Sequence, residues 1–318
     1  MDIKRINNNL WLSMLAAERS LDIDNDQFLN KPEIFQKERA DFFLNNPVAI
    51  PDTINVSDIE ILSSDQDYKI RLHIYQSKNY QKDRVILFFH GGGYVFGLPE
   101  QVDSQMFYIA EKLNATIVSV DYRLSPQFKY PIPIQDGFDA FNWLIQHGQD
   151  SLGLNVENIT LYGASAGGHL AGKVAQMAIE KGINNIKHQF LLYPVVNFRF
   201  DSDSMEDLKD ATLWTRESAK IARLHFLGEE YLSDNPTIAD LDNFSKLSEL
   251  PRTTIVACEL DSLRDEAINY AQLLLKAQVP TELWVVPGAV HVFDVFSSEI
   301  TNNFNSFLLN RLESHFQG

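Results

Sequence analysis

The chain has 318 residues, of which 45% are apolar and 22% charged, with 15 Gly and 12 Pro. This composition excludes collagen-like, low-complexity and wholly disordered classes, and the length fits one large domain or a core with a subdomain. The formal net charge of −16 repels phosphate backbones and anionic headgroups, so nucleic acid is an unfavourable partner. Cys258 is the only cysteine, which rules out an intrachain disulfide and favours a reducing, cytoplasmic location.

Residues 1 to about 50 have helical periodicity. Leu10, Met14 and Ala17 share one face, which predicts an amphipathic helix that docks on another part of the protein. A signal peptide is the weaker interpretation, because Asp2 and the run Asn7–Asn9 are polar. No apolar stretch approaches the ~18 residues of a transmembrane helix, so we expect no membrane span.

Strands and helices alternate through the rest of the chain. Tyr68–Tyr75 alternates apolar and polar residues, which predicts a half-buried antiparallel strand near a sheet edge. Apolar strands buried on both faces are predicted at Val85–Phe89, Thr116–Val120, Ile159–Tyr162, Gln189–Tyr193, Thr254–Cys258 and Leu283–Val286. Helices are predicted at Ser104–Leu113, Asp136–His147, Ser165–Glu180, Arg264–Ala277 and Ser298–Leu312. This order predicts an α/β fold with a mostly parallel central sheet and helices on both faces.

Residues 197–248 interrupt this alternation. They lie between the strand ending at Tyr193 and the strand starting near Thr253, and an apolar-periodic piece within them stops at Gly228. An insertion at this point, above the sheet, would form a lid.

The sequence Gly163-Ala164-Ser165-Ala166-Gly167 joins a predicted strand to a predicted helix. This is the context of a nucleophile elbow, in which the serine hydroxyl projects above the sheet edge. A side chain at Gly163 or Gly167 would press against a neighbouring strand or helix, and Ser165 would have a strained backbone. The alternative is an ordinary turn with a surface serine, which the flanking strand and helix disfavour.

His90-Gly91-Gly92-Gly93 directly follows the strand Val85–Phe89. Three consecutive glycines leave bare N–H groups that can bind a developing oxyanion. The alternative, a phosphate-binding loop, lacks the Gly-Lys-Ser/Thr ending and the Gly-x-Gly-x-x-Gly spacing. His90 is expected to organise the loop.

A serine nucleophile needs a base, and His291 is our candidate. It lies just past the last predicted strand, where the carboxyl ends of parallel strands meet beside the elbow. His169, four residues after Ser165 on the same helix, is expected to point away from the hydroxyl.

Asp261 is the candidate for the orienting acid, because it follows the strand Thr254–Cys258. Asp265 and Glu266 compete with it, but they begin a helix, where carboxylates complement the helix dipole. Asp294 follows the base too closely to orient it easily. Three further charged residues, Arg123, Asp121 and Asp136, are interpreted as a structural ion-pair set.

With these residues in place, the chain resembles the hormone-sensitive-lipase-like family of α/β-hydrolases, typified by bacterial carboxylesterases. Five motifs in the family's order carry the resemblance: His90–Gly93, Asp121–Pro126, Gly163–Gly168, Asp261–Glu266 and His291–Phe293. The resemblance implies a catalytic triad of Ser165, Asp261 and His291 and an oxyanion hole formed by the N–H groups of Gly92, Gly93 and Ala166. It also implies a helical cap of residues 1–50 and 197–248 on a catalytic core of residues 51–196 and 249–318.

Four positions depart from the family's usual residues. Ala164 stands in place of Asp, His169 in place of Asn, Ser262 in place of Pro and Gln127 in place of Glu. Because of these departures, the sequence does not predict the hydrogen bonds behind the elbow or the conformation of the turn that carries Asp261. It does not predict the rate or the pH optimum either.

We therefore predict a metal-independent serine carboxylesterase that hydrolyses short-chain acyl esters through an acyl-enzyme, without a cofactor. Its partner would be a small-molecule ester, and a homodimer is left open. Candidate pocket residues are Tyr94, Phe96, Trp214 and Phe226, although apolar residues there fit a cap core equally well. Two alternatives remain: a non-catalytic ligand-binding homologue, and a triad hydrolase acting on amides or acetylated sugars.

Overall fold

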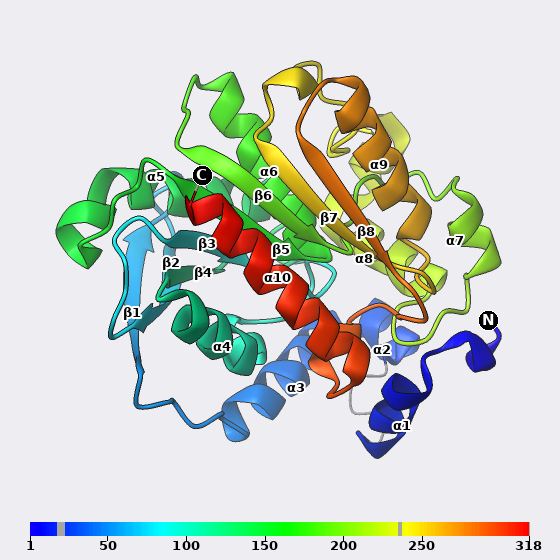
Figure 1. Ribbon diagram of the computed structural model, residues 1–318. Coiled ribbons are helices and arrows are strands. Elements are labelled where there is room, and N and C mark those ends of the chain that lie inside the picture. Colours follow the sequence, from blue (N-terminus) through cyan, green and yellow to red (C-terminus); the bar gives the residue numbers. More distant parts are fainter. Residues whose placement is uncertain (18–22, 235–236, 318) are drawn as a thin grey trace.

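The centre of the fold is an eight-stranded sheet (Figure 1). The computed structural model describes residues 1–17, 23–234 and 237–317. The sheet order is β1-β2-β4-β3-β5-β6-β7-β8. The strands are β1 (Ile54–Leu62), β2 (Lys69–Ser77), β3 (Val85–Phe89), β4 (Thr116–Asp121), β5 (Ile159–Ala164), β6 (Ile186–Leu192), β7 (Arg252–Cys258) and β8 (Thr281–Val286).

Strand pairing sets where the loops of the site emerge. β2 runs antiparallel to both β1 and β4, and the remaining pairs are parallel. In the parallel part Phe89 pairs with Gly163, and Leu192 pairs with both Ala164 and Val256. The carboxyl ends of β3, β5, β6 and β7 therefore reach the same edge of the sheet, where ligands of open α/β sheets bind.

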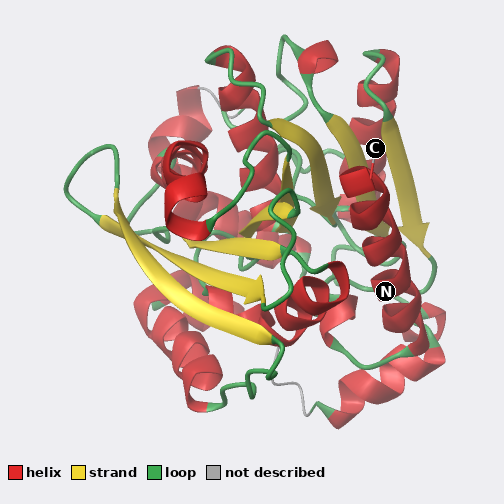
Figure 2. Ribbon diagram, turned by 60° about the vertical axis from the view of Figure 1, so that its left-hand side comes forward, coloured by secondary structure: helices red, strands yellow, loops and turns green. Residues whose placement is uncertain are grey.

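Helices cover both faces of this twisted sheet (Figure 2). Along β3, Ile86 and Phe88 face a core shared with α4, α10 and α1, whereas Val85, Leu87 and Phe89 face a core shared with α5, α6 and α9. This strict alternation is the two-residue period of a strand buried on both sides. The helices concerned are α1 (Asn8–Ala16), α4 (Asp103–Leu113), α5 (Ile132–Leu152), α6 (Ala166–Glu180), α9 (Arg264–Lys276) and α10 (Glu299–Gln317).

The remaining helices lie in the two segments that interrupt the alternation. They are α2 (Asn25–Asn30), α3 (Pro32–Asn45), α7 (Asp203–Asp207) and α8 (Arg216–Asp234). The short 3₁₀ turns are η1 (Ile3–Arg5), η2 (Pro99–Val102), η3 (Leu247–Glu249) and η4 (Phe293–Val295), of which η2 and η4 lie outside these segments. α2 contacts both α3 and α8, although almost two hundred residues separate α2 from α8 in the chain. Gly228 has φ 76° and ψ 166°, which kinks α8.

The predicted α/β class is confirmed, and the predicted strands and helices are all present, with α5 longer than expected at both ends. The docked helix near the N-terminus is also confirmed, because α1 buries Leu10 and Met14 beside α10. β1 was not predicted. Its alternation breaks at Ser57 and Asp58, and only Ile54 and Ile61 are buried in it, so the period of two is hard to recognise.

None of the helices in the described ranges is both long enough and apolar enough to cross a bilayer.

Candidate active site

The tight turn between β5 and α6 carries Ser165. Ser165 has φ 57° and ψ −121°, which is an unfavourable conformation for a residue other than glycine. Its N–H donates to the carbonyl of Leu192 (2.9 Å), which ties the turn to β6. A Cβ at Gly163 would lie 2.1 Å from the carbonyl oxygen of Gly167, and one at Gly167 would lie 2.0 Å from that of Phe89. The expected strain at the serine and the need for both glycines are confirmed.

Three predicted residues meet at the sheet edge. The hydroxyl of Ser165 lies 2.9 Å from Nε2 of His291, and Nδ1 of His291 lies 2.6 Å from Oδ2 of Asp261. All three side chains are buried. Nδ1–H of His291 donates a hydrogen bond to Asp261, so Nε2 is left to accept the hydrogen bond from the serine. This arrangement can transfer a proton from the hydroxyl to the imidazole.

The turn that carries Asp261 is anchored from two sides. The N–H of Leu263 donates to Oδ1 of Asp261 (3.1 Å), so both carboxylate oxygens have partners. Ser204, at the start of α7, donates its hydroxyl to the carbonyl of Ser262 (2.7 Å) and its N–H to Asp265 (2.8 Å). The family commonly has proline at the position of Ser262. Here, the hydrogen bonds from Ser204 of α7 support this turn.

The glycine loop after β3 is held by His90, as predicted. Nδ1 of His90 donates to the carbonyl of Gly91 (2.8 Å), and the ring stacks on Tyr122 with centroids 4.2 Å apart. Tyr122 in turn donates its hydroxyl to the carbonyl of His90 (2.8 Å). Burial lowers the pKa of His90, so the ring is neutral at physiological pH.

Gly92 and Gly93 line the cavity above Ser165. Gly92 has φ 128°, and a Cβ there would lie 1.9 Å from the carbonyl oxygen of Phe96, so this position requires glycine. Within the described ranges, the N–H groups of Gly92 and Gly93 donate to no backbone carbonyl. Ala166 follows the serine as the first residue of α6, where N–H groups have no partner within the helix. These three N–H groups are available to an oxyanion.

His169 is buried in an aromatic cluster, pointing away from Ser165. Its Nε2 donates to the carbonyl of Ala239 (2.8 Å), and its ring meets Tyr94 and Phe198 edge-on at 5.6 and 5.4 Å. Burial lowers its pKa to about 3, so the ring stays neutral. His169, which stands where the family commonly has Asn, thus connects α6 to the chain segment before η3.

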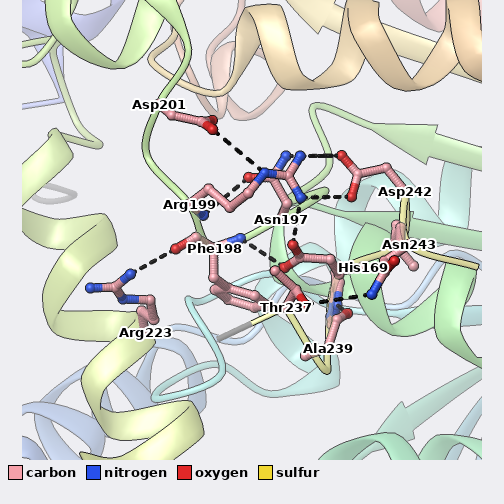
Figure 3. Close-up of polar contacts among 12 residues, drawn as sticks. His169, Asn197, Phe198, Arg199, Asp201, Arg223, Thr237, Ala239, Asp242 and Asn243 are labelled. Atoms are coloured by element: carbon pink, nitrogen blue, oxygen red, sulfur yellow. Dashed lines mark hydrogen bonds and ion pairs between the residues drawn. The ribbon is translucent and has the colours of Figure 1, made fainter. Parts of the chain in front are cut away.

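An ionic network beside His169 joins the segment after β6 to the loop before η3 (Figure 3). Arg199 donates through Nη1 to Asp240 (2.6 Å) and to Asp242 (3.0 Å). The N–H of Phe198 donates to Asp240 (3.0 Å), and Arg223 of α8 donates to the carbonyl of Phe198 (2.7 Å). Burial raises the pKa of Asp240 to about 6 in spite of Arg199. The network fixes the positions of the chain on both sides of α8.

The predicted ion-pair set of Arg123, Asp121 and Asp136 is partly wrong. Arg123 and Asp136 form a buried pair (Nη2–Oδ1 2.6 Å), and Arg123 also contacts Asp65 (2.7 Å). Asp121, however, bonds to Arg71 of β2 (2.9 Å), because the antiparallel register places these two residues directly opposite each other. This register follows from sheet order, which local sequence does not reveal.

Asp265 and Glu266, both in the first turn of α9, have different surroundings. Asp265 accepts hydrogen bonds from Nε of Arg264 (2.7 Å) and from the N–H of Ser204 (2.8 Å). Burial raises the pKa of Asp265, but these two bonds hold it below the ordinary value. Glu266 is only 2% exposed, and burial raises its pKa well above the ordinary value.

Above the triad lies a cavity of about 160 Å³. Phe96 and Trp214 line it, as expected of pocket residues. Tyr94 and Phe226 do not: they stack on each other at 3.9 Å inside the protein and are at most 1% exposed. The other lining side chains come from distant parts of the chain and include Ile23, Arg39, Phe43, Gln101, Gln105, Tyr193, Leu213, Asp294 and Val295.

Several of these lining residues were not predicted from the sequence. Arg39, Gln105 and Tyr193 belong to no motif, and only the tertiary structure brings them to one cavity. Asp294 was considered only as an orienting acid. Its position three residues after His291, on the turn that follows the base, was the available signal that it faces the same cavity.

The profile of the alpha/beta hydrolase fold family matches residues 86–295, which is more than half of the chain. The chain belongs to this family. Esterase LipI of Mycobacterium tuberculosis is 34% identical over 207 residues, which are 65% of this chain and 64% of LipI. Carboxylesterase NlhH of the same species is 32% identical over 216 residues, 67% of each chain, and an arylesterase of Saccharolobus solfataricus is 30% identical over 233 residues, 72% and 74% of the two chains.

Solved structures extend the similarity to the whole chain. A bacterial heroin esterase covers 100% of both chains with 25% identity and a TM-score of 0.89. An esterase of Pyrobaculum calidifontis covers 97% of this chain and 98% of its own, with 27% identity and a TM-score of 0.82. Within the α/β-hydrolases the chain thus falls in the hormone-sensitive-lipase-like family, together with relatives that are named esterases and carboxylesterases.

Proposed function

We propose that the chain is a serine carboxylesterase that hydrolyses short-chain acyl esters through a covalent acyl-enzyme. The observation that carries this proposal is the hydrogen-bonded series Ser165–His291–Asp261 at the floor of the cavity, with bonds of 2.9 and 2.6 Å. The glycine N–H groups next to it have no backbone acceptor among the described residues. Nucleophile, base and oxyanion donors thus converge on one cavity, as acyl transfer requires.

In the first half of the reaction, the Ser165 oxygen attacks the ester carbonyl carbon while Nε2 of His291 takes the hydroxyl proton. The tetrahedral intermediate collapses, the bond to the alcohol oxygen breaks, and His291 returns the proton to that oxygen. Water then attacks the acyl-enzyme with the same base, and the acid and free Ser165 are released. Asp261 stabilises the imidazolium that forms in both halves.

The N–H groups of Gly92, Gly93 and Ala166 would bind the oxyanion of each tetrahedral intermediate. Their positions are set before substrate binds, since Gly92 is confined by Phe96 and Ala166 by the elbow. One such donor contributes about a hundredfold to a thousandfold in rate.

The preference for short chains rests on the size of the cavity. A volume of about 160 Å³ is small beside the ~300–1,000 Å³ typical of pockets for drug-sized ligands. Phe43 and Trp214 narrow it from the side of the two helical segments. We also propose that residues 1–50 and 197–248 form a cap over the core, a proposal supported by the contacts of α2 with α3 and α8.

The test measures hydrolysis of p-nitrophenyl acetate, butyrate, octanoate and palmitate by the wild type and Ser165→Ala, with excess chelator present. We expect activity that falls with chain length and a loss on the order of a millionfold in the variant. A chelator-sensitive activity, or an organophosphate adduct on a peptide without Ser165, would contradict the serine mechanism. A folded wild type that binds these esters but turns none over would indicate a ligand-binding homologue instead.

A further inference from the structure

One wall of the cavity carries a carboxylate that the proposed reaction does not use. Asp294 lies in η4, three residues after His291, and lines the cavity together with Ser165. The proposed triad already has its acid, because both oxygens of Asp261 are bonded to other groups. Asp294 therefore needs a different explanation.

The partners of Asp294 are uncharged. The hydroxyl of Tyr193 donates to Oδ1 (2.6 Å), and the side-chain amide of Gln105 donates to Oδ2 (3.3 Å). Within the described ranges, no lysine or arginine forms an ion pair with Asp294. A carboxylate offers about four lone-pair sites, so two hydrogen bonds leave it able to accept more. Burial is the largest influence on this group and raises the pKa of Asp294, as expected for a carboxylate without a compensating cation.

Among the described residues, the other charged or titratable side chains that line the cavity are Arg39, Tyr193 and His291. Arg39 of α3 places its guanidinium 4.9 Å from the ring centroid of Phe35 and 6.0 Å from that of Phe96. Arg39 thus lies over two aromatic rings, whereas Asp294 is held by Tyr193 and Gln105.

The reaction geometry indicates which part of an ester would reach Asp294. His291 must deliver a proton to the departing alcohol oxygen, so the alcohol portion lies on the imidazole side of Ser165. The ring of Tyr193 lies 4.7 Å from the ring of His291, and the same tyrosine bonds to Asp294. Asp294 therefore lies on the side of the cavity where the alcohol portion of an ester would lie.

We propose that Asp294 is a specificity-determining residue that binds a cationic ammonium group in the alcohol portion of the substrate. The preferred substrates are then short-chain esters of amino alcohols or quaternary-ammonium alcohols. This inference rests on the proposed function, since it assumes that Ser165 and His291 cleave an ester in this cavity. A charge pair inside a partly desolvated cavity is worth more than the same pair in water, so the charge of the alcohol should change kcat/KM strongly.

The test compares acetylthiocholine with 3,3-dimethylbutyl thioacetate, which has the same shape without the charge. Thiol release gives kcat/KM for both in the full-length wild type and in Asp294→Asn. We expect the wild type to prefer the cationic ester at least about tenfold, the preference to weaken at high salt, and Asp294→Asn to abolish it. The matched control is Tyr193→Phe, which removes a hydrogen bond to Asp294 but keeps its charge, and should retain the preference.

The ratio of kcat/KM for the cationic ester to that for the uncharged ester separates a role in specificity from a structural role. A structural role would lower kcat/KM for both esters and leave their ratio unchanged. A wild-type ratio near one, a ratio unchanged in Asp294→Asn, or a preference for the anionic 3-(acetylthio)propanoate would overturn the inference and leave the proposed function intact. If the wild type cleaves neither thioester nor p-nitrophenyl acetate, the proposed function fails as well. Should Asp294→Asn not fold, competitive inhibition of the wild type by choline is compared with inhibition by its uncharged isostere 3,3-dimethylbutan-1-ol; equal inhibition by the two would overturn the inference.

Discussion

Ser165, Asp261 and His291 all lie on turns that follow core strands, whereas Phe43 and Trp214, which line the same cavity, belong to segments that contribute no strand. We call these two sets the floor and the roof of the cavity. The ring of Trp214 also stacks on that of His291, with centroids 5.8 Å apart. Hydrogen bonds of 2.6 to 2.9 Å and a strained elbow position the floor. The roof is positioned by the packing of apolar and aromatic side chains from helices far apart in the chain.

The floor and the roof should therefore respond differently to substitution, one in the rate of hydrolysis and the other in the preference between esters. Groups of the floor would contact the reacting atoms, so their removal should lower the rate for every ester. Groups of the roof bound the space for the substrate, so their removal should change the ratio between esters. Three of the four predictions below test this separation, and the prediction for His169 tests the packing behind the elbow.

The largest effect is expected from Asp261→Asn. The amide cannot stabilise an imidazolium and favours the wrong tautomer of His291, so kcat should fall about ten-thousandfold for acetate and butyrate esters alike. The control is Asp265→Asn, which removes a neighbouring carboxylate that bonds to Arg264 and Ser204. A greater loss of kcat in the control would refute the assignment of the orienting acid.

Gly92→Ala should lower kcat about a hundredfold to a thousandfold. The added Cβ would lie 1.9 Å from the carbonyl oxygen of Phe96, so the loop must shift and displace an oxyanion donor. Gly182→Ala is the matched control, because Gly182 also has a positive φ of 68° but an added Cβ meets no atom within 4 Å. Pre-steady-state acylation by p-nitrophenyl acetate measures the step concerned, and equal losses in both variants would rule out a specific role for Gly92.

In His169→Asn, the free energy of unfolding should decrease less at acidic pH than it does in the wild type. The folded-state pKa of about 3 lies below the ~6.5 of an unfolded histidine, so the stabilisation is present above pH 6.5 and is lost as the pH falls towards 3. Between pH 7.5 and 4.5 this histidine alone should cost about 2 to 3 kcal/mol of unfolding free energy. Urea unfolding at both pH values measures the difference, and an identical loss in the wild type and the variant would contradict it.

Trp214→Ala should change substrate preference more than rate. Trp214 lines the main cavity and also a second, smaller cavity of about 20 Å³, so its removal joins the two. The ratio of kcat/KM for p-nitrophenyl octanoate to that for acetate should rise about tenfold. Trp143→Ala on α5 removes an indole that does not line the main cavity, and the same ratio should stay unchanged. A uniform loss on all esters would show that Trp214 supports the floor instead.

Local sequence predicted the parts of the protein whose causes are local. The buried strands follow from continuous apolar runs, and the elbow glycines follow from the lack of space at Gly163 and Gly167. The unpredicted β1 and the misassigned Asp121 both depend on the antiparallel edge of the sheet. Tyr94 and Phe226 were expected in the pocket because aromatic character does not reveal which way a side chain faces.

The sequence by itself therefore determined the α/β alternation, the strained turn at Ser165 and the order of its motifs, since each depends on backbone sterics and on periodicities of two or 3.6 residues. Only the tertiary structure decided that Trp214 bounds the cavity, that Arg199 joins the two sides of α8, and that Asp294 lines the same cavity as Ser165. These features depend on which distant segments pack together. The free energy of that packing is a sum over many contacts across the sheet edge, and no short stretch of sequence contains it.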